Sequence, residues 1–261
     1  MTYILENDHK QGMTRDEIDS TVSVLVLAGS GATTATALAA TTYFALLDPG
    51  VMSRLQEEIW DVMRDDPKNI TIAALNRLPY LHAVLQESMR MHPPVPVAVP
   101  RVVDRPGVEI CGVAVPHGHR VGVPPRTAYL LPTKWVDAHK FLPERWFSDA
   151  DLRHANDDKA MFEPFMVGPR SCMGKNLAWA ELKLILAKMI WSFDLELSEK
   201  NQGDWTDQKV YLINENFANV CQASTKGVVH YGHVTGYLRV MVFPRRQEVI
   251  ALGKKCALHQ T

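Results

Sequence analysis

Residues 165–174 read FMVGPRSCMG, a loop that holds one cysteine between two glycines. The residues after it predict an amphipathic helix over about 175–191, with apolar positions at Leu177, Trp179, Leu182, Leu184, Ile185, Leu186, Met189 and Ile190. Cys172 then lies at the helix N-terminus, where unpaired N–H groups and the helix dipole stabilise a sulfur anion. Gly168 and Gly174 allow the backbone to approach a flat ligand closely. The loop therefore predicts a metal-bound thiolate.

The spacing Phe-x-x-Gly-x-Arg-x-Cys-x-Gly is complete in this loop and resembles the haem-binding loop of the cytochrome P450 monooxygenases. A lone cysteine near a turn is more often a buried structural residue, but the complete motif favours a ligand. The resemblance implies that Cys172 is the axial ligand to the iron of heme b. It also implies that Arg170 contacts a haem propionate and that Phe165 packs beside the sulfur. Gly168 and Gly174 then lie against the cofactor.

Glu87 and Arg90 lie three residues apart on a predicted helix that starts at Pro79. Such a pair is usually solvated and stabilises a helix by about 0.2–0.5 kcal/mol. Downstream, residues 141–146 read FLPERW and resemble the Pro-Glu-Arg element of the same family. The resemblance implies a buried structural triad of Glu87, Arg90 and Arg145, in which one carboxylate joins two guanidinium groups.

Arg101 follows the apolar stretch of residues 95–100. In the family this stretch runs past the haem edge, and the resemblance implies that Arg101 contacts a haem propionate. A cationic anchor beside an apolar wall suits an amphiphilic porphyrin with two carboxylates. The alternative is an exposed arginine at the start of a strand.

The oxygen-side helix departs from the family pattern at residues 28–34, which read AGSGATT. The resemblance makes Thr33 and Thr34 the candidate catalytic residues, with Thr33 as the preferred oxygen-side hydroxyl. Ala32 stands where the family has an acid, so proton delivery has to use water and the threonine hydroxyls. Gly31 is one extra residue, which rotates the preceding helix by about 100° unless a bulge absorbs it.

The helix pattern around these threonines starts at a capping box, Thr14-x-x-Glu17, and continues to about Leu47. Residues 20–47 carry no charge and are long enough to cross a bilayer. They are rich in Ser, Thr and Gly and have no flanking Lys/Arg cluster or aromatic belt, which favours a buried helix of a large protein.

The rest of the chain predicts a mainly α fold with a small β region, like the C-terminal half of the cytochrome P450 fold without its N-terminal anchor and helices. Further helices are expected at about 51–64 and 71–76, short strands at 108–110, 113–115 and 120–123, a turn at 116–118, irregular structure over 127–165, and a hairpin of 194–197 with 209–212. Residues 1–215 are expected to form the partial cytochrome P450 domain. Residues 216–261 are expected to be an unrelated tail, disordered or misread.

Composition excludes several classes of protein. The chain has 261 residues, a net charge of -1 and a pI near 6.8, so its overall charge does not favour nucleic acid. Its four cysteines are widely spaced, which argues against disulfide partners or a zinc ribbon. The N-terminus has no signal-peptide pattern. Family members are anchored in the endoplasmic reticulum membrane; this chain, without an anchor, is expected on the cytoplasmic side.

The resemblance implies a haem-dependent monooxygenase that uses O2 to hydroxylate or epoxidise an apolar small molecule, with electrons from NADPH–cytochrome P450 reductase. Lys175, Lys183 and Lys188 are candidates for the reductase-docking face, against the usual interpretation as solvated lysines. Residues 85–94 and 174–178 are most similar to fungal secondary-metabolite enzymes of the trichothecene hydroxylase type. One alternative is a truncated, non-catalytic remnant that binds haem poorly or not at all; another is haem-thiolate chemistry that rearranges a peroxide.

Overall fold

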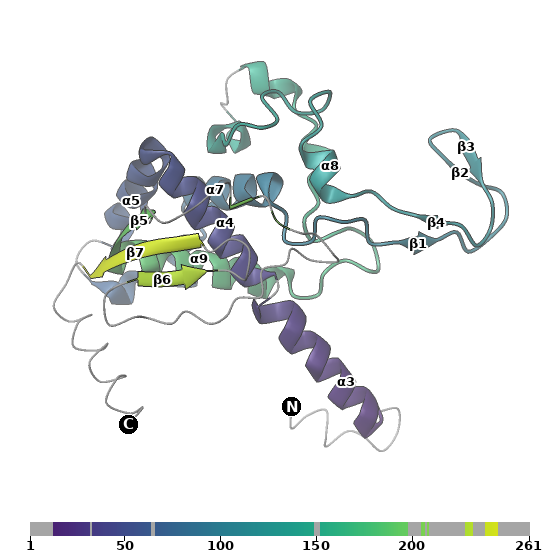
Figure 1. Ribbon diagram of the computed structural model, residues 1–261, viewed down its shortest axis with the longest axis horizontal. Coiled ribbons are helices and arrows are strands. Elements are labelled where there is room, and N and C mark those ends of the chain that lie inside the picture. Colours follow the sequence, from purple (N-terminus) through teal and green to yellow (C-terminus); the bar gives the residue numbers. More distant parts are fainter. Residues whose placement is uncertain are drawn as a thin grey trace.

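Helices form the body of the molecule, and three small antiparallel sheets lie at its edges (Figure 1). The computed structural model describes residues 13–31, 33–63, 66–148, 152–197, 205–206, 208, 228–231 and 238–244. This arrangement confirms the prediction of a mainly α fold with a small β region.

The first helical stretch is not one continuous α-helix. It consists of α3 (Arg15–Val26), the π-helical turn η1 (Leu27–Gly31) and α4 (Thr34–Leu47). The predicted capping box is present, since Thr14 Oγ1 accepts from the N–H of Glu17 at 3.3 Å and Glu17 Oε2 accepts from the N–H of Thr14 at 2.7 Å. A π-helical turn accommodates one extra residue in the helical ladder. It is the bulge that the extra Gly31 requires.

The two halves of this stretch differ in burial. In α4, ten side chains are buried, which confirms the expected buried helix for that half. In α3, Ile18 is the one buried side chain, and residues 24–27 are 50–64% exposed. Figure 1 shows α3 projecting away from the other helices. By length and composition alone Arg15–Leu47 could cross a bilayer, which is weak support for a membrane span.

The core lies between α4, α5 (Pro49–Met63), α7 (Pro79–Met91) and α9 (Lys175–Ser192). Fully buried side chains from these helices fill it, among them Leu55, Ile59, Leu81, Leu85, Leu182, Leu186 and Ile190. The predicted apolar stripe of α9 is partly wrong, because Leu177 and Ile185 are exposed. Eight apolar positions occupy more than one side of a helix, and the core covers one side. Two short helices, η2 (Pro67–Asn69) and α6 (Ile72–Leu75), join α5 to α7.

The middle of the chain forms two small sheets. Strand β1 (Arg101–Val102) pairs with β4 (Arg120–Val121), and β2 (Val108–Ile110) pairs with β3 (Val113–Val115). Cys111 and Gly112 connect β2 to β3 with positive φ angles of 51° and 76°, as a two-residue hairpin turn requires. The β2–β3 hairpin extends to one side of the molecule (Figure 1).

The described residues of the segment 127–165, predicted to be irregular, hold no long helix or strand. Four short helical segments lie in or beside it: α8 (Pro125–Tyr129), η3 (Pro143–Trp146), η4 (Leu152–Asn156) and η5 (Lys159–Met161). After α9, strand β5 (Phe193–Leu197) pairs with β7 (Leu238–Pro244), which also pairs with β6 (Val228–Tyr231). The predicted partner of β5, residues 209–212, lies outside the described residues. Two segments of the predicted tail thus join a sheet with β5, and the boundary at residue 215 stays a prediction.

Candidate functional site

The cysteine loop presents its sulfur at the start of α9. The N–H of Cys172 donates to the carbonyl of Phe165 at 2.8 Å, which closes the loop. Met166 and Gly168 have φ angles of 59° and 79°, and the N–H of Ser171 donates to the carbonyl of Gly168 at 3.0 Å. These turns leave the Cys172 side chain exposed, two residues before the N-cap of α9. The loop therefore offers a thiol to a ligand outside it.

The cysteine loop and the first turn of α9 carry exposed apolar side chains, and exposed cations lie in the loop or reach it. Val167, Met173 and Leu177 are 66%, 89% and 63% exposed, although each is apolar. Arg170 and Arg101 are exposed as well. Arg101 reaches the loop, since its Nη2 lies 3.6 Å from the sulfur of Met166. An apolar surface with a sulfur and guanidinium groups suits a flat, apolar ligand that carries carboxylates.

The predicted triad residues come together in a buried ion network. Glu87 accepts from Arg90 through two bonds, Nε to Oε2 at 2.9 Å and Nη2 to Oε1 at 2.8 Å, and from Arg145 Nε to Oε1 at 3.0 Å. All three side chains are fully buried. Trp146 Nε1 and the N–H of Leu142 also donate to the Glu87 carboxylate, each at 3.0 Å. The carboxylate thus joins α7 to η3, as the structural role requires.

A second carboxylate completes this network, and the sequence analysis missed it. Asp157 is buried and bonds Arg145 Nη1 through Oδ2, while its Oδ1 accepts from the N–H of Val136 at 2.7 Å. His154 Nδ1 lies 3.4 Å from Arg145 Nη1. Two carboxylates therefore face two guanidinium groups. No spacing rule distinguishes Asp157 from its partly exposed neighbour Asp158, so the sequence pattern gave no signal for Asp157.

The network also fixes the irregular segment after α8. Arg90 Nη1 donates to the carbonyls of Tyr129 at 2.8 Å and Ala138 at 2.7 Å, and Arg90 Nη2 donates to the carbonyl of Lys140 at 3.1 Å. The buried Trp135 lies beside both guanidinium groups, 5.3 Å from Arg90 and 5.9 Å from Arg145. One buried arginine thereby holds three backbone carbonyls of a segment without regular structure.

The candidate threonines bond to the π-helical turn. Thr33 Oγ1 donates to the carbonyl of Ala28 at 2.6 Å, and Thr34 Oγ1 donates to the carbonyl of Gly29 at 3.0 Å. Thr34 is buried, whereas Thr33 is half-buried. Thr33 is therefore the more accessible hydroxyl. Ala32 lies outside the described residues.

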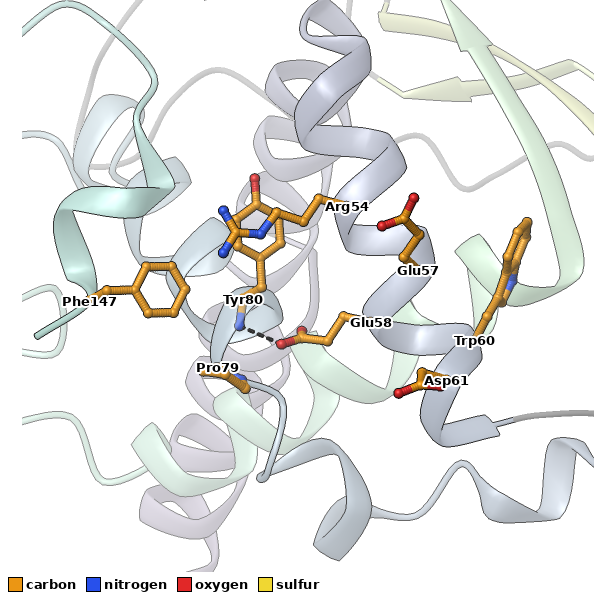
Figure 2. A pocket seen from close by; sticks show the side chains of 8 residues that line it. All are labelled: Arg54, Glu57, Glu58, Trp60, Asp61, Pro79, Tyr80 and Phe147. Atoms are coloured by element: carbon orange, nitrogen blue, oxygen red, sulfur yellow. Dashed lines mark hydrogen bonds between the residues drawn. The ribbon is translucent and has the colours of Figure 1, made fainter. Parts of the chain in front are cut away.

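An open pocket of about 690 Å³ lies away from the cysteine loop, between α5, the start of α7 and Phe147 (Figure 2). The Arg54 guanidinium stacks on Tyr80, 4.2 Å from the ring centroid, and donates to Glu144 Oε1 at 3.1 Å. Burial, followed by the charge of Glu144, raises the pKa of Tyr80. Glu58 accepts from the N–H of Tyr80 at 2.8 Å. These groups pair with one another, and none belongs to the cysteine loop.

The metal prediction rests on Cys172, because no group of three or more His, Cys, Asp or Glu side chains gathers as a metal site within the described part of the chain. The docking prediction for Lys183 is wrong. Lys183 is buried on the core side of α9, and its Nζ donates to Asn76 Oδ1 at 3.0 Å. Lys175 and Lys188 are exposed.

A model of the cytochrome P450 family matches residues 1–221. The chain belongs to the cytochrome P450 family. It is 41% identical over 213 residues to the cytochrome P450 monooxygenase aclL of Aspergillus oryzae, a match that covers 82% of this chain and 43% of the relative. It is 45% identical over 207 residues to traB of Penicillium crustosum, covering 78% and 40%. It is 37% identical over 228 residues to a trichothecene C-4 hydroxylase of Trichoderma arundinaceum, covering 85% and 45%.

These matches confirm the resemblance to fungal cytochrome P450 monooxygenases, and the chain spans less than half the length of these relatives. Family membership implies a haem-thiolate cofactor. The residues present fit such a group: Cys172 is an exposed thiol, its neighbours Val167, Met173 and Leu177 are exposed and apolar, and two exposed arginines lie on the same loop or bond to it.

Proposed function

We propose that this chain is the thiolate-bearing part of a haem-dependent monooxygenase that hydroxylates or epoxidises an apolar small molecule in fungal secondary metabolism. The observation that carries the proposal is the exposed Cys172 thiol on a loop closed by its own backbone N–H, among exposed apolar side chains. A trichothecene C-4 hydroxylase and several fungal cytochrome P450 monooxygenases are among its relatives. A bound haem supplies the iron that activates O2, with electrons from an NADPH-dependent reductase.

The residues of this chain have separate tasks in the proposal. Cys172 supplies the sulfur ligand, and Arg101 and Arg170 supply positive charge for the two propionates. Phe165 orders the cysteine through its carbonyl. Gly168, at a φ of 79°, permits the turn before Arg170. Gly174 keeps the sulfur uncovered, because a Cβ there would lie 3.8 Å from Cys172 Sγ.

Proton handling on the oxygen side falls to Thr33. Its hydroxyl proton is donated to the carbonyl of Ala28, so its oxygen lone pairs are available to accept a hydrogen bond from water. With Ala32 in the acid position, water supplies the mobile proton and Thr33 Oγ1 orients that water. Thr34, which is buried, stabilises the π-helical turn.

The second candidate is a chain that does not bind haem productively by itself. The exposure of residues 24–27 favours it, because these four apolar neighbours at the end of α3 and the start of η1 lack a covering surface in the described structure. Both candidates predict the same fold but differ in whether the chain alone holds the cofactor.

The experiment is to express the full chain with haem supplied, reduce it under carbon monoxide and record the absorption spectrum. The proposal expects the long-wavelength Soret band of a thiolate-ligated carbonyl complex, and Cys172→Ser removes the band while Cys111→Ser retains it. A band that survives in Cys172→Ser contradicts the ligand assignment. No band in the chain alone, but a band after fusion to the N-terminal part of a relative, supports the second candidate.

A further inference from the structure

An aromatic column connects the cysteine loop to α7. It consists of Phe165 in the loop, Trp179 in α9 and His82 in α7. The Phe165 and Trp179 ring centroids are 5.8 Å apart at an interplanar angle of 52°. The Trp179 and His82 centroids are 4.4 Å apart at 45°. Tilted ring pairs at these distances are attractive. Three side chains from three different segments thus form one continuous contact.

The imidazole ring at the His82 end of the column is electrically neutral. His82 Nδ1 is buried and has no hydrogen-bond partner within the described part of the chain. Burial, followed by the charge of Lys183, lowers the pKa of His82 to about 4, so its ring is neutral near pH 7. Lys183 Nζ lies 6.0 Å from the Trp179 ring and donates to Asn76. A buried polar atom without a partner is costly, so its presence calls for a reason.

The other end of the column bears directly on the cysteine. The ring of Phe165 contacts Trp179, while the carbonyl of the same residue accepts the Cys172 N–H at 2.8 Å. The packing of the Phe165 ring and the hydrogen bond that orients Cys172 thus meet in one residue. Because His82 lies on α7, five residues before Glu87, the column also connects the loop to the helix that the buried ion network fixes.

We propose that His82 and Trp179 are positioning residues for Cys172. They hold the Phe165 ring, and through the Phe165 carbonyl they fix the direction in which the Cys172 sulfur faces its ligand. The imidazole serves as a flat ring against Trp179, which explains why one of its nitrogens is left without a partner. The expected change in the haem spectrum rests on the proposed function. The expected change in the Cys172 hydrogen bond does not, because it is measured without haem.

The haem-free test measures backbone amide exchange at Cys172 in the full chain, with the Gly118 amide as internal reference. Gly118 donates to the carbonyl of Val103 in a loop outside the column, at the same 2.8 Å. Trp179→Leu and His82→Leu are expected to speed exchange of the Cys172 amide by roughly two- to tenfold and to leave Gly118 unchanged. His82→Phe, which keeps a ring, is expected to retain the slow exchange.

The haem-bound test compares the same variants by the position of the reduced carbonyl band and by the reduction potential of the iron. His82→Leu and Trp179→Leu are expected to shift the band and the potential, and His82→Phe is expected to keep the wild-type values. Trp60 is an exposed tryptophan of α5, so Trp60→Leu is the control and should change neither. Unchanged exchange in His82→Leu and Trp179→Leu overturns the inference. Exchange as fast in His82→Phe as in His82→Leu overturns it also. If the wild-type chain lacks the reduced carbonyl band, this counts against the proposed function but not against the inference. The amide exchange result still decides whether His82 and Trp179 position Cys172.

Discussion

The ion network around Glu87 and the loop around Cys172 are opposite in their surroundings. Glu87, Arg90 and Arg145 are fully buried, and each charge has partners inside the chain. Cys172 and Arg170 are exposed. The first region is complete by itself, because a buried charge without a partner is strongly unfavourable. The second presents its functional groups outward, as a binding surface does. Under the proposed function, stability and ligand binding belong to separate parts of the chain.

The strongest test of this division is Glu87→Gln. It leaves two buried guanidinium groups with one carboxylate, so the free energy of unfolding is expected to fall by about 3–5 kcal/mol. The matched control is Glu144→Gln, whose partner Arg54 is half exposed and which should cost about 1 kcal/mol or less. Urea denaturation followed by circular dichroism measures both. Equal losses would mean that burial does not separate the two carboxylates.

Asp157→Asn comes next. It removes the second negative charge from the network, but Arg145 keeps Glu87, so the expected loss is about 1–3 kcal/mol. Asp158→Asn at the neighbouring position affects a partly exposed pair with Lys134 and is expected to cost less than about 1 kcal/mol. The same denaturation measurement ranks the two. A larger loss for Asp158→Asn would remove Asp157 from the network.

The start of α7 offers a smaller effect. The N-cap residue Leu78 has no side-chain cap. Glu58 of α5 instead accepts a hydrogen bond from the N–H of Tyr80 at 2.8 Å (Figure 2) and another from the N–H of Leu81, also at 2.8 Å. Glu58→Ala should therefore cost about 1 kcal/mol, as loss of a helix cap does. Glu57→Ala, one residue earlier and exposed, should be close to neutral. Thermal unfolding of the two variants checks this, and similar midpoints would show that the cap is not needed.

The smallest expected effect is the pH dependence of the free energy of unfolding. It comes from His82, which lies between the two regions. Its pKa is about 4 in the folded chain and near 6.5 when unfolded, so the unfolded state binds the extra proton as pH falls. Stability is therefore unaffected above about pH 6.5 and falls between pH 6.5 and 4. The pKa difference sets an upper limit of about 3 kcal/mol, which partial exposure reduces to about 1 kcal/mol. His82→Phe should lose less stability than wild type between pH 7 and pH 5; parallel curves would contradict the low pKa.

The sequence predicted the elements whose signals are local. The capping box at Thr14 and the Pro79 start of α7 depend on neighbours within four residues, and both helices begin where expected. The cysteine loop is equally local, so its motif identified the family. What it could not show are contacts over long separations. Asp157 bonds to Arg145, twelve residues earlier in the chain, and the pairing of β5 with β7 joins strands about 45 residues apart.

Lys183 and Glu58 are two charged residues whose partners the sequence did not predict. A lysine in a helix with several lysines looks solvated, yet the turn of α9 places Lys183 on the core side, against Asn76. Glu58 follows another glutamate, Glu57, in α5, yet it caps a different helix, α7. In both cases the partner is set by helix packing, which composition and periodicity do not encode.

The π-helical turn at Leu27–Gly31 sets how far α3 is rotated about its axis relative to α4. Deleting one residue there would restore an ordinary α-helix and turn α3 by about 100° about its axis relative to α4. The buried face of α4 would keep its direction, while the apolar residues 24–27 would point elsewhere. The rotation of α3 about its axis relative to α4 is thus set by one residue in the π-helical turn, and not by the chemistry of the side chains on α3.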